Sequence, residues 1–126
     1  MNEMDLLKIV AKAYNNLDYK EIETIASEDI VYESQDVFSA LEGKKAVLNY
    51  LQPKFETVKN SGRPVFAEIG FIKDQSRSCI IMSQGTVDNK ISVVLIESRD
   101  EKLSRIDICT AFPHWSQATG TNEYPV

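Results

Sequence analysis

The second half of the chain is the feature that most limits its possible folds. From residue 65 onward, apolar and β-branched residues fill four stretches of strand length, at 65–73, 78–86, 90–98 and 103–112. The segments that separate these stretches are short and polar, and they contain Asp at each break, as hairpin turns often do. Three short connections in succession predict an antiparallel meander of four strands.

The first half of the chain carries mainly helical patterns. Residues 3–16 place apolar side chains at helical spacing, which predicts a first helix. Asp18 with Glu21 three residues later resembles a capping box and predicts a second, short helix. Residues 30–34 are β-branched and aromatic, so we expect a short strand there.

A third helix is expected after Gly43, with Pro53 inside it as a kink or a point of restart. The expected order is helix, helix, strand, helix and four strands, which is an α+β fold. We expect a single domain over residues 1–126, in which residues 116–126 lose periodicity and form a loose tail.

Charge and cysteine usage narrow the class of function. The formal net charge is -5 and comes from scattered acids, so a nucleic-acid partner or an anionic membrane surface is not expected. No leader-like segment or long apolar run stands out, and we expect a cytoplasmic protein. Cys79 and Cys109 lie outside any CxxC spacing, and we expect both to be free thiols.

Two stretches carry a resemblance to a known family. The sequence NNLDYKEIETIASEDIVYES, followed by LEGKKAVLNYL, resembles the nuclear transport factor 2-like (NTF2-like) superfamily, also called SnoaL-like, over residues 5–113. The resemblance implies a cone-like, curved, mixed and mostly antiparallel sheet wrapped on three N-terminal helices, with a pocket at its open end. Members include isomerases, epoxide hydrolases, polyketide cyclases and non-enzymatic binding proteins, many of them dimeric through the sheet, so the fold does not select an activity.

Hairpin register predicts which side chains of the meander face the pocket. Two-residue turns at 88–89 and 100–101 would place one apolar set on the concave face. This set comprises Val65, Ala67, Ile69, Phe71, Ile80, Met82, Gln84, Ile91, Val93, Leu95, Ile106, Ile108, Thr110 and Phe112. The opposite face would carry Phe66, Glu68, Ile72, Cys79, Ile81, Ser83, Val94, Ile96, Arg105, Asp107 and Cys109. That face is apolar enough to predict a homodimer through the outer surface of the sheet.

The catalytic patterns that the resemblance implies are poorly matched. The steroid-isomerase branch uses a tyrosine and two aspartates, and their positions here hold Val10, Ser34 and Val93. The epoxide-hydrolase branch needs an Asp-Arg-Asp relay inside the cavity, whereas Arg105 and Asp107 fall on the outer face in this register. The remaining acid–base candidates are weak, and they are Tyr32, Glu97 and His114. No metal-ligand spacing or phosphate-binding loop is present, and no cofactor is expected.

The polar groups expected on the concave face are few and mostly neutral, which suits a small, largely apolar ligand. The expected ligand-binding residues are Tyr14, Tyr32, Ser34, Phe55, Met82, Gln84, Val93, Ile108, Thr110 and Phe112. Three hypotheses follow: a non-catalytic small-molecule-binding domain, a cofactor-free isomerase, cyclase or hydrolase, and a protein-interaction domain. An alternative to all pocket hypotheses is a cup filled by its own side chains.

Overall fold

The first helix forms where its periodicity predicts. The computed structural model describes residues 1–35, 39–110 and 118–126, and α1 spans Glu3–Asn16. A capping box starts the helix, because the backbone N–H of Asp5 donates to Asn2 Oδ1 at 2.8 Å and the N–H of Asn2 donates to Asp5 Oδ2 at 3.1 Å. Leu17 ends the helix in the left-handed conformation, with φ of 51°.

Two further helices lie on the same side of the sheet as α1. Helix α2 spans Lys20–Ile25, and α3 spans Lys44–Asn60. The expected restart at Pro53 does not occur, since α3 is a single element. Pro53 is exposed, while Leu51 and Phe55 on either side of it are buried, so tertiary packing holds the helix together across the proline.

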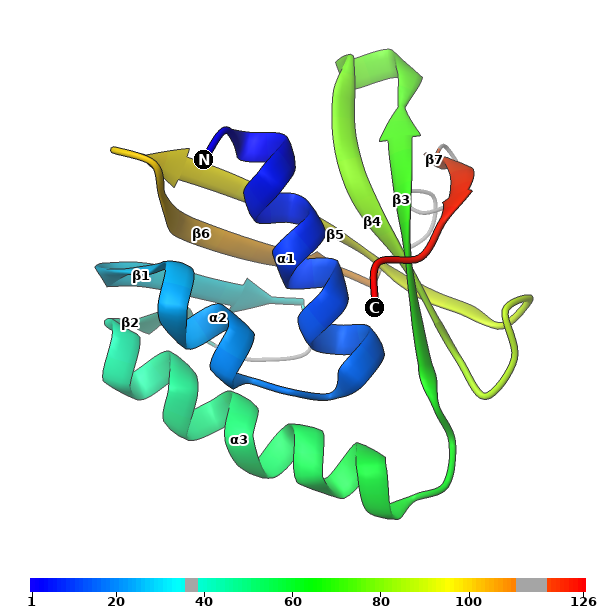
Figure 1. The fold of residues 1–126 in the computed structure, drawn as a ribbon, viewed down its shortest axis with the longest axis horizontal. Helices are drawn as coiled ribbons and strands as arrows, with labels where there is room; N and C mark the ends of the chain where they lie inside the picture. Colours follow the sequence, from blue (N-terminus) through cyan, green and yellow to red (C-terminus); the bar gives the residue numbers. More distant parts are fainter. Residues whose placement is uncertain (36–38, 111–117) are drawn as a thin grey trace.

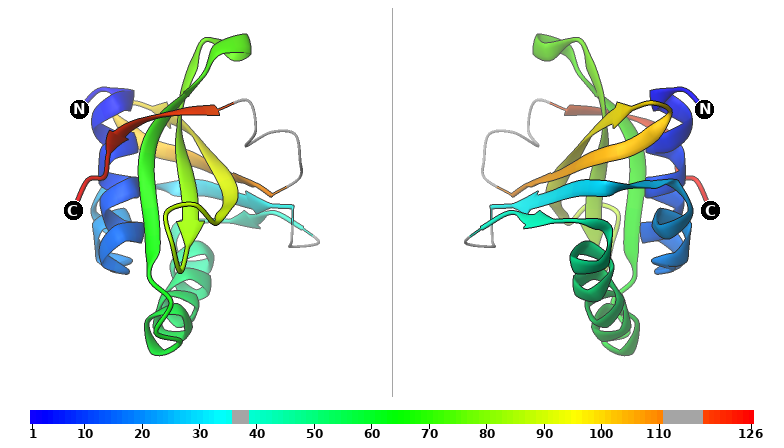
Figure 2. Two further views of the ribbon diagram at one scale, coloured as in Figure 1. Left: turned by 90° about the vertical axis from the view of Figure 1, so that its right-hand side faces the viewer. Right: turned by 90° about the vertical axis from the view of Figure 1, so that its left-hand side faces the viewer.

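The sheet is mixed, mostly antiparallel and strongly bent, as expected (Figures 1 and 2). Its strands are β1 (Ala26–Ser34), β2 (Leu41–Glu42), β3 (Val65–Ile72), β4 (Arg77–Gln84), β5 (Lys90–Arg99), β6 (Lys102–Cys109) and β7 (Ala118–Glu123). Their order across the sheet is β2-β1-β6-β5-β4-β3-β7, and only β1 and β6 pair in parallel. The meander β3 to β6 is therefore confirmed. Helix α1 packs against β3 and α3 packs against β1, on the concave side of the bend.

The predicted loose tail is wrong for residues 118–123, which form β7 on the edge of the sheet beside β3. Gly70 of β3 and Gly120 of β7 lie opposite each other, and a Cβ on Gly120 would come within 2.1 Å of the Glu68 carboxylate. That carboxylate accepts a hydrogen bond from the backbone N–H of Asn122 at 2.7 Å. The pairing thus depends on backbone and glycine geometry, and the apolar pattern of the sequence does not reveal it.

The C-terminal residues continue from β7 to the end of α1, and the C-terminus lies beside this helix (Figure 1). Asn15 joins three segments there. Its Nδ2 donates to the carbonyls of Ala67, at 2.9 Å, and Pro125, at 2.6 Å, while its Oδ1 accepts from the N–H of Ala67 at 2.7 Å. One side chain therefore fixes α1 to β3 and to the chain end.

The predicted register of β5 is wrong. The expected two-residue turn at 88–89 does not form, because Ser83 and not Val87 pairs with Lys90, and two β-bulges then change which face the side chains of β5 occupy. The turn at 100–101 pairs Arg99 with Lys102 as expected, but a bulge after Glu97 shifts the pairing by one residue. A second bulge lies between the pairs Ser83–Lys90 and Met82–Ser92. Each bulge moves the following side chains to the other face, so residues 92–97 are turned over relative to the prediction.

This inversion exchanges the two faces along β5. Val94 and Ile96 lie in the main core, whereas Val93 and Leu95 belong to a second apolar cluster on the outer face. That cluster consists of Ile72, Cys79, Ile81, Val93 and Ala118, with Leu95 packed against it. Its five core members are buried within the single chain, so a partner is not required to cover them. Homodimerisation through this face stays a prediction.

The main core lies between the helices and the concave face of the sheet. It combines Leu6 and Val10 of α1, Leu51 of α3 and the inward side chains of the strands, of which Ile80 and Ile106 are fully buried. Both cysteines are free thiols. None of the described helices is long and apolar enough to cross a membrane.

Candidate functional site

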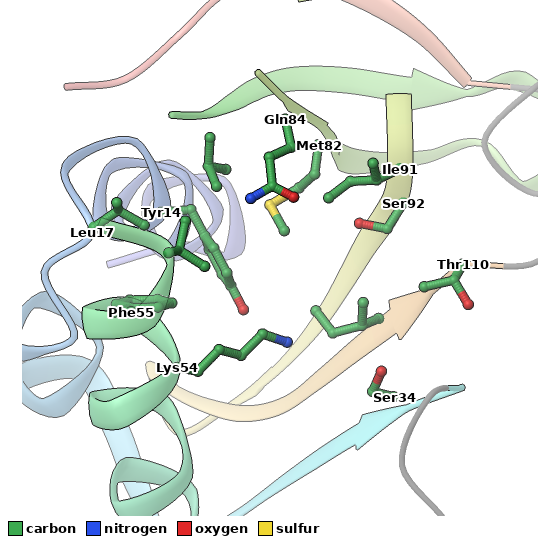
Figure 3. A pocket seen from close by; sticks show the side chains of 13 residues that line it. Tyr14, Leu17, Ser34, Lys54, Phe55, Met82, Gln84, Ile91, Ser92 and Thr110 are labelled. Atoms are coloured by element: carbon green, nitrogen blue, oxygen red, sulfur yellow. The ribbon is translucent and has the colours of Figure 1, made fainter. Parts of the chain in front are cut away.

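A cavity of about 260 Å³ opens at the wide end of the bent sheet, and we call it the cup (Figure 3). The cup lies at the ends of α1 and β4 and at the beginnings of β3 and β5. Helix α3 also contributes to its wall. Thirteen described residues line it: Tyr14, Leu17, Ser34, Lys54, Phe55, Val58, Val65, Met82, Gln84, Ile91, Ser92, Ile108 and Thr110. Apolar side chains dominate the lining, and neutral polar groups are interspersed among them.

Most of the expected ligand-binding residues reach the cup. Seven of them line it, namely Tyr14, Ser34, Phe55, Met82, Gln84, Ile108 and Thr110. Tyr32 is only 1% exposed and does not line the cavity; its ring packs against Tyr50 with a centroid distance of 5.3 Å. Val93 was placed wrongly, because the bulge points it to the outer face. Phe112 lies outside the described residues.

Six lining residues were not among the expected ligand contacts, namely Leu17, Lys54, Val58, Val65, Ile91 and Ser92. Ser92 opposes Met82 after the bulge, so Ser92 lines the cup and the expected Val93 does not. Ile91, the extra residue of the bulge, also lines the cup, as its predicted inward orientation suggested. Lys54 reaches the cavity from α3; its position directly before Phe55 and one turn after Tyr50 was the available signal.

Two hydroxyl groups of the lining are buried without a hydrogen-bond partner. The Tyr14 hydroxyl and the Ser92 Oγ make no hydrogen bond to any described group, and their residues are 3% and 2% exposed. Burial raises the pKa of the Tyr14 phenol well above its ordinary value, so the group is a neutral donor at every physiological pH. A buried, unpaired hydroxyl costs about 1–3 kcal/mol, which marks both groups as unusual for a finished core.

The tyrosines behind the cup form a continuous aromatic wall. Tyr14 meets Phe55 edge-on at a centroid distance of 5.0 Å, and Tyr32 lies tilted against Tyr50. Burial raises the pKa of Tyr32 strongly, with Tyr14 and Tyr50 as further contributors. The Tyr32 hydroxyl also lacks a partner of acceptable hydrogen-bond geometry, including Tyr14. Neutral phenols packed in this way provide rigid, mainly apolar contact area.

Lys54 is the one charged side chain among the described residues of the lining. Its Nζ lies 3.4 Å from the Tyr50 hydroxyl and 5.3 Å from the centroid of the Tyr50 ring. The side chain is half-buried, and no described carboxylate is within salt-bridge distance of Nζ. The cup therefore has a single cation at its wall and no described acid to neutralise it.

The proposed acid–base candidates are not brought together. Glu97 points to the outer face, where its carboxylate lies 3.7 Å from Arg105, because the bulge turns this part of β5 over. Tyr32 is buried beneath the lining, and His114 lies outside the described residues. No group of three or more His, Cys, Asp or Glu residues is placed to hold a metal ion in the described part of the chain.

The residues at the isomerase and hydrolase catalytic positions named above do not bring an acid or a base into the cup. Val10 is fully buried in the core, and the inward residues around position 93 are Ser92 and Val94. Arg105 and Asp107 face outward as predicted, and the Arg105 Nε donates to both carboxylate oxygens of Asp107 at 3.0 Å. The hydrogen bonds that Arg105 donates to Asp107 and Glu33 raise the pKa of the guanidinium, which stays charged.

Solved structures share this arrangement of bent sheet and helices. An NTF2-like protein of unknown function from Mesorhizobium loti superimposes with a TM-score of 0.66, at 14% identity, over 86% of this chain and 89% of that one. The chain has the NTF2-like fold. A SnoaL-like protein of unknown function from Burkholderia thailandensis matches with a TM-score of 0.63, at 11% identity, over 86% of this chain and 92% of its own.

The NTF2-like fold is also reached by a de novo designed protein with a curved β-sheet, with a TM-score of 0.63, 17% identity and 91% coverage of both chains. A fold by itself does not specify a function. No protein-family model matches the sequence, and no curated protein matches it. The function therefore has to be argued from the cup.

Proposed function

We propose that this chain is a binding domain for one small, mainly apolar molecule, which the cup encloses without catalysing a reaction. The observation that carries this proposal is an open, mostly apolar cavity whose buried Tyr14 and Ser92 hydroxyls have no protein partner. A ligand with a polar group would satisfy these hydroxyls, and its apolar part would contact Met82, Ile108 and their neighbours.

The size of the cup fits this class of ligand. A dry apolar cavity of about 150 Å³ is large enough to hold a benzene ring. The cup, at about 260 Å³, has room for a ring or a medium-length chain together with one polar group. The absence of a carboxylate, histidine or cysteine from the described lining favours binding over acid–base or nucleophilic chemistry.

Filling the cup tests the proposal. Ser92→Leu removes an unpaired buried hydroxyl and adds apolar volume inside the cavity, so the variant should remain folded and lose ligand binding. Binding of octanamide and of p-cresol is measured by isothermal titration calorimetry, with thermal unfolding as the test of folding. We expect at least one probe to bind the wild-type protein and to bind Ser92→Leu about tenfold more weakly or not at all.

Thr119→Leu is the matched control, because it adds the same side chain at an exposed position of β7. It should bind both probes as the wild-type protein does. The proposal is wrong if neither probe binds the wild-type protein, or if Ser92→Leu binds them as tightly as the wild-type protein.

A further inference from the structure

Lys54 differs from three other lysines, each of which pairs with a carboxylate. Lys8, Lys12 and Lys44 each lie within salt-bridge distance of a glutamate, at 3.2, 3.7 and 3.9 Å respectively. Lys54 instead rests against the hydroxyl and ring of Tyr50, and no carboxylate of the described residues pairs with it. Its charge is therefore compensated only by an aromatic contact and by solvent at the mouth of the cup.

A second group, on a different helix, indicates the same ligand chemistry. The Tyr14 hydroxyl comes from the end of α1, is buried, and has no hydrogen-bond partner. Figure 3 shows the Tyr14 hydroxyl and the Lys54 Nζ both directed into the cup. A neutral phenol and an ammonium group can each donate to the same oxygen acceptor, and hydrogen bonds to a charged acceptor are the stronger ones.

The rest of the lining sets the sign of the charge that fits. The described lining contains one cation and no acid, so an anion is attracted and a cationic ligand would face an uncompensated like charge. Beyond these polar groups the walls are made of Val58, Val65 and Met82, with other apolar side chains. A hydrocarbon group gains free energy by leaving water for such a surface.

We infer that the ligand of the cup is a small apolar acid, whose carboxylate binds between Lys54 and Tyr14 and whose hydrocarbon part fills the apolar end. This inference rests on the proposed function and adds the chemical class of the ligand to it. Ser92 and Gln84, on the far wall, are available to a second polar atom of the ligand.

Three eight-carbon probes that differ only in their head group test the inference: octanoate, octanamide and octylamine. Their affinities are measured by isothermal titration calorimetry at neutral pH for the wild-type protein, Lys54→Met and Lys54→Arg. Lys54→Met keeps the length of the side chain and removes the charge, and Lys54→Arg restores the charge. Lys59→Met is the matched control, because Lys59 is exposed on the same helix and does not line the cup.

The wild-type protein should bind octanoate about tenfold or more tightly than octanamide, and octylamine most weakly, as expected for a charge-assisted hydrogen bond. Lys54→Met should lose about tenfold in octanoate affinity and keep octanamide affinity within about twofold, and Lys54→Arg should recover part of the loss. Lys59→Met should bind all three probes as the wild-type protein does.

Two contrary results are distinguishable. If octanamide and octanoate bind equally well and Lys54→Met changes neither, the cup binds apolar molecules but the acid is not recognised, and this inference alone is wrong. If none of the three probes binds the wild-type protein, the proposed function and this inference both fail.

Discussion

The two faces of the bent sheet treat their polar groups in opposite ways. On the outer face Arg105 lies among Glu33, Glu97 and Asp107, so each charge there has a partner within the chain. On the inner side, between the sheet and the helices, the Tyr14 and Ser92 hydroxyls have no described partner, and no carboxylate of the described residues pairs with Lys54. The outer face also buries its apolar cluster within the chain, while the inner face leaves a cavity.

This difference is the basis for proposing the cup as the functional surface. A polar group that is satisfied within the chain contributes to folding alone, whereas an unpaired buried group has a cost that only another molecule removes. The charged residues that would attract attention in the sequence, Arg105 and Asp107, are on the satisfied face. Two of the buried unpaired hydroxyls, those of Tyr14 and Ser92, belong to residues that line the cup together with Lys54, whereas those of Ser27 and Tyr32 do not.

The largest effect on the free energy of unfolding is expected in β5, where the adjacent residues Ile96 and Glu97 point to opposite faces of the sheet. Ile96→Ala removes a core side chain that is 3% exposed, and it should lower the free energy of unfolding by about 2–5 kcal/mol. Glu97→Ala removes one exposed partner of Arg105 and should cost about 1 kcal/mol or less. Urea denaturation of the two variants measures both values. Equal losses, or a larger loss for Glu97→Ala, would contradict the bulged register.

A smaller effect is expected at the unpaired phenol. Tyr14→Phe removes a hydroxyl that has no protein partner, so the free energy of unfolding should change by less than about 1 kcal/mol, or rise. The same change should weaken octanoate binding, because a donor to the carboxylate is lost. Chemical denaturation and calorimetry on one preparation separate the two effects. A stability loss above about 2 kcal/mol would show that the hydroxyl is bonded in the folded protein.

The smallest expected effect is a difference in reactivity between the two thiols of the outer face. Burial raises the pKa of Cys79 to about 12, and burial also raises the pKa of Cys109, which is only half-buried. A raised pKa lowers the thiolate fraction, and the thiolate is the reactive form. At pH 8 a thiol reagent should therefore modify Cys109 first and Cys79 only slowly, with both rates rising as the pH increases towards 9. Mass spectrometry of the partly labelled protein identifies the order, and faster labelling of Cys79 would contradict the burial of β4.

The sequence is informative wherever an element is specified by its own apolar pattern. The limits of α1 and the meander of four strands follow from periodicity and turn residues. Six of the seven expected ligand contacts that line the cup follow from parity along β4 and β6 and from the apolar stripes of the helices, and Ser34 lies at the end of β1. Strand β7 was missed because its pairing depends on glycines and backbone hydrogen bonds rather than on an apolar alternation.

The errors at the site have two physical causes. The bulges at the ends of β5 insert single residues that turn residues 92–97 over, so Val93 was placed in the cup and Ser92 was not. Lys54 was overlooked because a lysine on an amphipathic helix usually points to solvent, whereas here its ammonium lies against Tyr50 and the residue lines the cavity. Both are tertiary effects, which local pattern does not encode.

The contrast between the faces can be measured directly through methyl groups. Isoleucine, valine and methionine methyls are labelled with carbon-13, and their spectra are recorded while octanamide is added to the wild-type protein. The methyls of Met82 and Ile108, which line the cup, should shift with increasing ligand, and those of Ile81 and Val93, in the outer cluster, should not. Shifts confined to Ile81 and Val93, or no shift at all, would contradict the account of the cup as the binding site.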